Sequence, residues 1–266
     1  MLTYESLIEQ AMSREMPSTK IRGILREYVQ ILILKEIYKL ELGRKLYFTG
    51  GTYLRLVHNL KRFSEDLDFN ANAITKGQFE DISNSVKNEL KRVGLESELE
   101  FSHWGGIYVA KVIFPEIERT YNAVSKYSKK RGIIIKIEAN KLDSKIETQT
   151  QMVSGFGEFY PVICTDTGIL FADKIDALNR KERGRHIYDI MFMLSGKYTV
   201  NTTFLRRLGI KRDPFEIISN RIKSFSKAEL KKQAEILRPF LFDESEADLL
   251  VNAHEVIPAL LSKYKK

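Results

Sequence analysis

The chain has 266 residues, of which 43% are hydrophobic and 29% are charged, so it can bury a sizeable core in one large or two small domains. A single cysteine, Cys164, excludes an internal disulfide. The N-terminus lacks a signal-peptide pattern, and the longest apolar stretch, residues 28–34, is too short to span a membrane, so we expect a cytoplasmic protein with no membrane partner.

The net charge of +8 favours a polyanionic partner such as nucleic acid or nucleotide phosphates. A plain basic surface without such a partner is the alternative.

The first part of the chain predicts a mixture of helices and strands. Apolar residues recur at helical spacing over residues 3–12 and from residue 18 to about residue 40. A short buried strand over residues 45–49, a glycine turn with a short helix, and a second strand over residues 64–70 follow.

Later segments continue this alternation. A capping box, Thr75 with Gln78, opens a helix that ends at Gly94. The next segments predict a hairpin of two strands, the strongest strand of the chain and one more short strand: residues 96–103, 107–114, 132–138 and 159–164.

From Asp166 onward helical periodicity dominates. Helices are predicted over residues 166–180, about 188–195, 226–237 and 246–261. The sequence therefore predicts an α+β protein. Residues 1–165 form an N-terminal domain with a mixed twisted sheet flanked by helices, and residues 166–266 form a C-terminal helical bundle domain.

The stretch from residue 48 to residue 69 carries the strongest chemical signal. Gly50 and Gly51 permit a tight turn and the close approach of a ligand. Thr52 is suited to cap the helix that follows, and the free N–H groups at a helix start favour phosphate.

Two carboxylates follow on the second strand. Asp66 and Asp68 alternate with apolar residues, so both lie on one face of that strand. Glu138 is the best candidate for a third carboxylate, because it ends an apolar strand and shares a face with Lys136. Carboxylates suit Mg²⁺ or Mn²⁺. Surface strands often carry such acidic pairs without function, so the pair gains weight only beside the glycine turn.

These residues resemble a motif of the AbiEii/AbiGii nucleotidyltransferase toxins, which belong to the DNA polymerase β-like superfamily. The motif comprises Gly50-Gly51-Thr52-x-Leu54-Arg55 and Arg62-x-Ser64-Glu65-Asp66-Leu67-Asp68-Phe69. A second motif of that family, a lysine followed by an arginine and an aspartate four residues apart, matches Lys174, Arg185 and Asp189.

The resemblance implies the toxin half of a toxin–antitoxin or abortive-infection pair, with a cognate antitoxin as a possible partner. It implies transfer of a nucleoside monophosphate from an NTP to an RNA acceptor, with the 3′ end of tRNA as the expected acceptor. It also implies roles for individual residues. Magnesium would be held by Asp66 and Asp68, and Glu138, chosen from its position on its strand, is the expected third ligand. The NTP would be bound by Gly50, Gly51, Thr52, Arg55, Arg62, Ser64, Lys174 and Arg185, with Asp66, Asp68, Lys174 and Asp189 as catalytic residues, in a cleft between the two domains.

Several alternatives stay open. Lys174 is a solvated lysine, Asp189 pairs only with Arg185, and Ser64 is only a turn residue in the simplest interpretation. The basic cluster of residues 126–131 is either a solvated loop or an RNA contact. The acceptor is a protein hydroxyl in a second hypothesis, and in a third the chain is a non-catalytic protein that binds nucleic acid or a partner.

Overall fold

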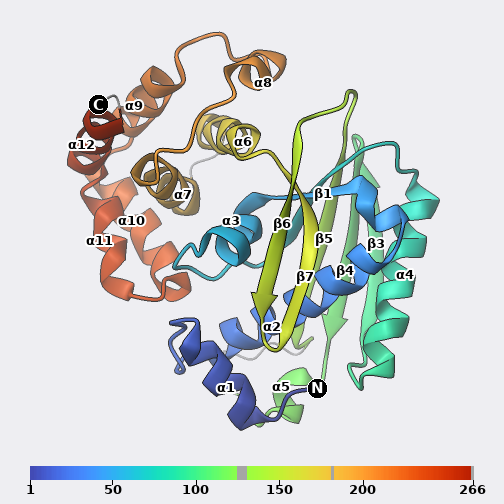
Figure 1. Cartoon of the computed structure of the whole chain (residues 1–266). Helices are drawn as coiled ribbons and strands as arrows, with labels where there is room; N and C mark the ends of the chain where they lie inside the picture. Colours follow the sequence, from blue (N-terminus) through green and yellow to red (C-terminus); the bar gives the residue numbers. More distant parts are fainter. Residues whose placement is uncertain (125–130, 181–182, 265–266) are drawn as a thin grey trace. The chain divides into compact units, whose positions relative to one another are not determined.

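A mixed β-sheet forms the centre of the first structural unit (Figure 1). The computed structural model describes residues 1–124, 131–180 and 183–264, and the chain divides into unit 1, Met1–Thr165, and unit 2, Asp166–Lys266. Within the described residues the sheet has seven strands in the order β3-β4-β5-β2-β1-β7-β6. β1 pairs in parallel with β7 and β2 in parallel with β5, while the other neighbours are antiparallel. The predicted α+β fold class is confirmed.

The elements of unit 1 are α1 (Tyr4–Ser13), α2 (Ile21–Lys39), a 3₁₀ turn (Leu42–Lys45), β1 (Leu46–Thr49), α3 (Gly50–His58), β2 (Leu67–Ala71), α4 (Lys76–Arg92), β3 (Glu98–Trp104), β4 (Ile107–Phe114), α5 (Ile117–Thr120), β5 (Ile133–Lys141), β6 (Thr148–Gly155) and β7 (Glu158–Thr165).

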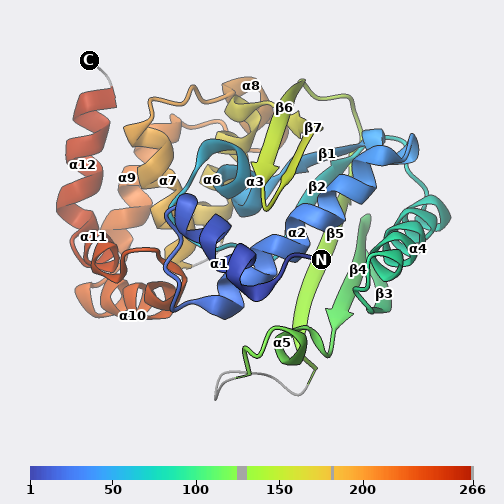
Figure 2. The same cartoon turned by 60° about the horizontal axis from the view of Figure 1, so that its bottom comes forward.

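The two faces of the sheet differ in polarity. Along β5 burial alternates, so that Ile133, Ile135 and Ile137 are buried while Lys136 and Glu138 are half-exposed. Helix α2 packs on β5 and β7, and α4 packs on β3 and β4, as Figures 1 and 2 show. Because side chains alternate between faces with a period of two, the half-exposed polar positions of β5 lie together on the face opposite its apolar side.

Aromatic side chains and one buried thiol lie at the centre of the sheet. The ring of Phe48 on β1 contacts those of Phe69 on β2 and Tyr53 on α3. Cys164 on β7 is the partner of Phe48 in the parallel ladder and is fully buried. Burial raises the pKa of the Cys164 thiol to about 12, although a hydrogen bond with Tyr53 lowers it slightly.

Unit 2 consists of helices. Asp166 starts the first of them, because its carboxylate accepts hydrogen bonds from the backbone N–H groups of Gly168 and Ile169. Ser226 and Glu229 form the predicted capping box. The elements are α6 (Thr167–Arg180), α7 (Gly184–Ser195), α8 (Thr202–Arg207), α9 (Pro214–Ser224), α10 (Lys227–Leu237), two 3₁₀ turns (Arg238–Phe240 and Glu244–Glu246), α11 (Ala247–Val251) and α12 (Ala253–Tyr264).

The structure differs from the sequence prediction in several elements. Helix α5 was not predicted, and β2 begins at Leu67, so Asp66 lies just before the strand that was predicted to carry it. Strand β6 was not predicted, because its residues are mostly polar and lie at an edge of the sheet, where no apolar alternation is required. The single helix expected over residues 246–261 is two helices that break at Asn252, whose side chain bonds the carbonyl of Asp248. Helices α8 and α9 were also missed. In the described part of the chain, no helix is long and apolar enough to cross a membrane.

Candidate active site

The glycine turn lies against the first predicted carboxylate. Strand β1 ends at Thr49, which pairs with Asp68 in the antiparallel ladder, and α3 begins at the next residue. Gly50 has a φ of +81°, and a Cβ atom added there would overlap the carboxylate of Asp68. Only glycine therefore satisfies both the backbone conformation and the contact at this position.

The second glycine brings two more predicted residues to the turn. A Cβ atom at Gly51 would lie 2.5 Å from Nη2 of Arg62 and 3.0 Å from Oγ of Ser64. Arg62 is buried, and its Nη1 donates to the carbonyl of Phe63 at 3.0 Å. The turn, Arg62 and Ser64 are therefore neighbours, and the N-terminus of α3 lies among them.

Thr52 has a different role from the one predicted. The residue before α3 is Thr49, and Thr52 lies inside the first turn, so the prediction that Thr52 caps this helix is wrong. Thr52 is fully buried, and its hydroxyl donates to the backbone carbonyl of Asp66. This hydrogen bond fixes the segment that carries Asp66 to the helix that follows the glycine turn. The Thr52 side chain therefore has a positioning role.

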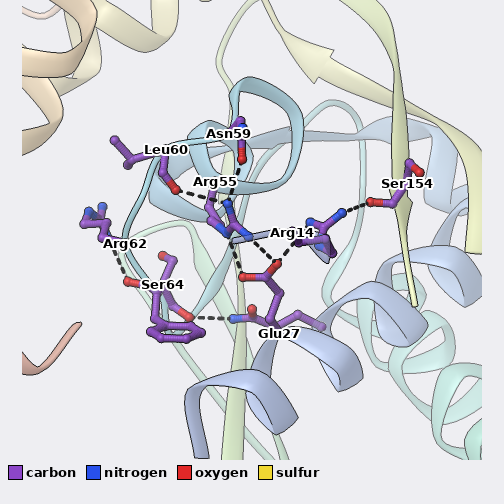
Figure 3. A network of polar contacts seen from close by, with 10 residues as sticks. Arg14, Glu27, Arg55, Asn59, Leu60, Arg62, Ser64 and Ser154 are labelled. Carbon is purple, nitrogen blue, oxygen red and sulfur yellow. Dashed lines mark hydrogen bonds and ion pairs between the residues drawn. The ribbon is translucent and has the colours of Figure 1, made fainter. Parts of the chain in front are cut away.

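Arg55 also corrects the prediction. Its side chain is 1% exposed, and its guanidinium donates two hydrogen bonds to Glu27 on α2, from Nε at 2.8 Å and from Nη2 at 3.1 Å. It also bonds Asn59 and the carbonyl of Leu60. Figure 3 shows this network, in which Arg14, the residue that follows α1, binds the same Glu27 carboxylate at 3.0 Å. We therefore assign Arg55 a structural role in place of the predicted NTP contact.

Three carboxylates lie on the polar face of the sheet. Asp68 on β2 and Glu138 on β5 are directly paired in the parallel ladder, and Asp66 immediately precedes β2. Between them lies Lys136, whose Nζ is 2.8 Å from Glu138 and 3.4 Å from Asp66. Burial lowers the pKa of Lys136, but the hydrogen bond with Glu138 and the charges of the carboxylates outweigh burial and raise it.

The chemical type of these three ligands suits a divalent cation. Mg²⁺ prefers carboxylate oxygens, and the ammonium of Lys136 demonstrates that Asp66 and Glu138 can both reach one cation. In residues 1–124, 131–180 and 183–264, however, no three His, Cys, Asp or Glu side chains form a ready-made metal cluster. Lys136 occupies the position between the carboxylates in this structure.

Unit 2 contains a second polar group. Lys174 on α6 and Asp189 on α7 form an ion pair of 2.7 Å, and both residues are buried. Arg185 lies one turn before Asp189 on α7 and is half-buried. Lys174 is therefore not the solvated lysine of the simplest interpretation, because its side chain is buried and its ammonium pairs with Asp189. The pairing offsets the cost of burying either charge alone.

Asp173, which the sequence did not single out, lies beside this pair. Burial, followed by the charge of Asp176, raises the pKa of the Asp173 carboxyl to about 7, although Lys174 and Arg180 oppose this shift. A carboxyl group that titrates near neutral pH is therefore the sequence neighbour of Lys174.

The geometry of unit 1 and the sequence motif lead to one family. The sequence model of the AbiEii toxin, described as a nucleotidyl transferase of a type IV toxin–antitoxin system, matches residues 32–252. The chain belongs to the AbiEii nucleotidyltransferase toxin family. A nucleotidyltransferase fold and activity follow from this membership.

Solved structures share the fold of this AbiEii member at low sequence identity. MenT4, a nucleotidyltransferase toxin from Mycobacterium tuberculosis H37Rv, is 17% identical with a TM-score of 0.58, and the match covers 100% of this chain and 92% of MenT4. JHP933 from Helicobacter pylori is 15% identical with a TM-score of 0.54, and the match covers 91% of this chain and 93% of JHP933. A comparison with curated proteins gave no match.

Residues 126, 129 and 130 of the predicted basic cluster lie outside the described residues, while Arg131 pairs with Glu100 on β3. Sequence analysis missed the contacts of Lys136 with the carboxylates. The spacing of Lys136 and Glu138, two residues apart on one strand, was the available signal.

The Arg55–Glu27 pair yields a stability prediction. We expect Arg55→Met to lower the free energy of unfolding by about 3–5 kcal/mol, because it leaves the buried Glu27 carboxylate without its closest partner. Urea unfolding followed by circular dichroism measures this loss. Arg92→Met on α4, which removes an exposed pair with Glu89, is the matched control and should change the stability by less than about 1 kcal/mol. Equal losses in both variants would contradict the structural role of Arg55.

The raised pKa of Asp173 predicts a pH-dependent stability. Between the ordinary pKa of 3.8 and about 7, the unfolded chain ionises at this position while the folded chain does not, so stability falls as pH rises through this window. Asp173→Asn removes this loss. We expect it to be more stable than the wild type by about 1–2 kcal/mol at pH 8, allowing for partial exposure, with a smaller difference at pH 4.5. Thermal unfolding across this range, with the exposed Asp81→Asn as control, tests the prediction; a difference independent of pH would refute it.

Proposed function

We propose that this AbiEii member is a magnesium-dependent toxin that transfers a nucleoside monophosphate from an NTP to an RNA acceptor, with the 3′ end of tRNA as the first candidate. The observation that carries the proposal is the position of Asp66, Asp68 and Glu138 beside the glycine turn. Because NTPs and tRNA are cytoplasmic, the reaction implies a cytoplasmic protein. The type IV assignment of the family supports a cognate antitoxin as a further partner.

The glycine turn and its neighbours are suited to the triphosphate. The N-terminus of α3 presents backbone N–H groups at Gly50 and Gly51, where phosphate is favoured. Arg62 and Ser64 lie against Gly51 and supply a charged and a hydroxyl group for the phosphate oxygens. These contacts would hold the pyrophosphate leaving group while the acceptor approaches.

The carboxylates would carry the chemistry at the α-phosphate. Asp66, Asp68 and Glu138 would hold Mg²⁺, which would lower the pKa of the attacking hydroxyl and neutralise charge on the phosphate. The acceptor oxygen forms a bond to the α-phosphorus, the bond to the pyrophosphate breaks, and the hydroxyl proton leaves to solvent. Positioning and charge neutralisation supply most of the rate in such transfers.

Residues of unit 2 complete the proposal. We assign Lys174 to the negative charge of the phosphates and Asp189 to the orientation of Lys174, which the 2.7 Å ion pair supports. Arg185 is assigned to the nucleotide. These roles follow the family motif and its order along the chain.

Loss of one carboxylate should abolish most of the transfer. We expect Asp68→Asn to lower the rate of NMP incorporation by about 10²–10³-fold, because several kcal/mol of charge stabilisation are lost without a large change in shape. The rate is measured with four α-labelled NTPs and purified tRNA. Asp81→Asn on α4 is the control and should retain the wild-type rate.

The same assay separates the three hypotheses. Label in tRNA that depends on Asp68 supports the proposal. Label in proteins of a cell lysate, but not in RNA, would replace the RNA acceptor by a protein hydroxyl. Growth arrest that persists in Asp66→Ala and Asp68→Ala, with no label in any fraction, would favour a non-catalytic binding protein.

A further inference from the structure

The ammonium of Lys136 contacts two of the three proposed metal ligands. Its Nζ lies 2.8 Å from Glu138 and 3.4 Å from Asp66, and the charge of Asp68 also acts on it. Its side chain is 32% exposed, so the ammonium is partly shielded from water. Lys136 lies outside both family motifs and outside the predicted NTP contacts.

Neighbouring residues make this placement specific. Lys111 on β4 is directly opposite Lys136 in the antiparallel ladder and therefore lies on the same face of the sheet. Lys111 is paired instead with Glu100 on β3, at 3.8 Å. Of these two lysines on adjacent strands, it is Lys136 that binds the carboxylates proposed to hold the metal.

Lys136 and a divalent cation require the same oxygen atoms. Asp68 and Glu138 occupy paired positions on adjacent strands, and Asp66 is close enough to share a cation with Glu138, so the three negative charges repel one another. The ammonium compensates this repulsion in the structure. A metal ion that binds these carboxylates must displace the ammonium and must also overcome its positive charge at short range.

We propose that the ammonium of Lys136 excludes free divalent cations from the acidic site formed by Asp66, Asp68 and Glu138. The metal would then enter together with the NTP. Triphosphate oxygens supply further ligands to the metal, and their negative charge gives the displaced ammonium a new partner. The inference rests on the proposed function of this site, since it names the order in which metal and nucleotide are bound.

Metal binding without nucleotide tests the proposal directly. Mn²⁺ is titrated into the full chain and detected by electron paramagnetic resonance. We expect Lys136→Met to bind Mn²⁺ about tenfold more tightly than the wild type, because a positive charge beside the ligands is removed. Lys136→Arg keeps the charge and should bind as weakly as the wild type. Lys111→Met, which removes the same charge one strand away, should change the affinity much less.

A second titration measures the dependence on nucleotide. In the presence of saturating α,β-methylene NTP analogues, tested for all four bases, the wild type should bind Mn²⁺ far more tightly than alone. The increase should be smaller in Lys136→Met, because the barrier that the nucleotide overcomes is already removed. Circular dichroism and thermal unfolding confirm that each variant is folded before it is titrated.

Wild-type Mn²⁺ binding that is tight without nucleotide, or equal affinities in the wild type and Lys136→Met, overturns the proposal. So does an equal gain in Lys136→Met and Lys111→Met, since the effect would then be general to the surface charge. Failure of the proposed function is seen separately, as an absence of label transfer by the wild type, whereas the Mn²⁺ titrations do not depend on turnover.

Discussion

The candidate site depends on the buried ion pairs that Glu27 forms with Arg14 and Arg55. Through Arg14 and Arg55, Glu27 joins the end of α1 to α2 and α3, in a place where an unpaired charge would be costly. Arg55 also forms hydrogen bonds with Asn59 and Leu60, which lead from α3 toward residues 64–66, here called the carboxylate segment. The ion pairs of Glu27 therefore stabilise the connection after α3, which brings Asp66 and Asp68 to the glycine turn.

Polar contacts with the backbone complete this arrangement. Thr52 binds the carbonyl of Asp66, and Gln30 of α2 binds the carbonyl of Ser64, so each end of the carboxylate segment is fixed by a side chain from a helix. The active groups face the polar side of the sheet, while the residues that hold them are buried. Rigid support of this kind keeps reacting groups in the geometry that transfer requires.

Local patterns predicted what depends on local structure. The α+β class followed from the change in periodicity near Asp166, and the placement of Lys136 and Glu138 on one face of β5 followed from strand alternation. The contact of Gly50 with Asp68 depends on the pairing of β1 with β2. The roles of Thr52 and Arg55 could not be predicted, because they depend on Asp66 and Glu27, which lie 14 and 28 residues away in sequence. A charged residue among the apolar positions of a helix, such as Glu27, is a signal of a buried partner but does not identify that partner. The roles proposed for Lys174, Arg185 and Asp189 remain predictions from the family motif.

The burial of Cys164 has a practical consequence for spectroscopy. The sequence contains no other cysteine, and a buried thiol with a raised pKa reacts slowly with maleimides and methanethiosulfonates. A cysteine introduced at an exposed position of either unit would therefore be labelled selectively, without removing the native thiol from its packing against Phe48. Fluorescent or spin-labelled protein prepared in this way would retain its native core.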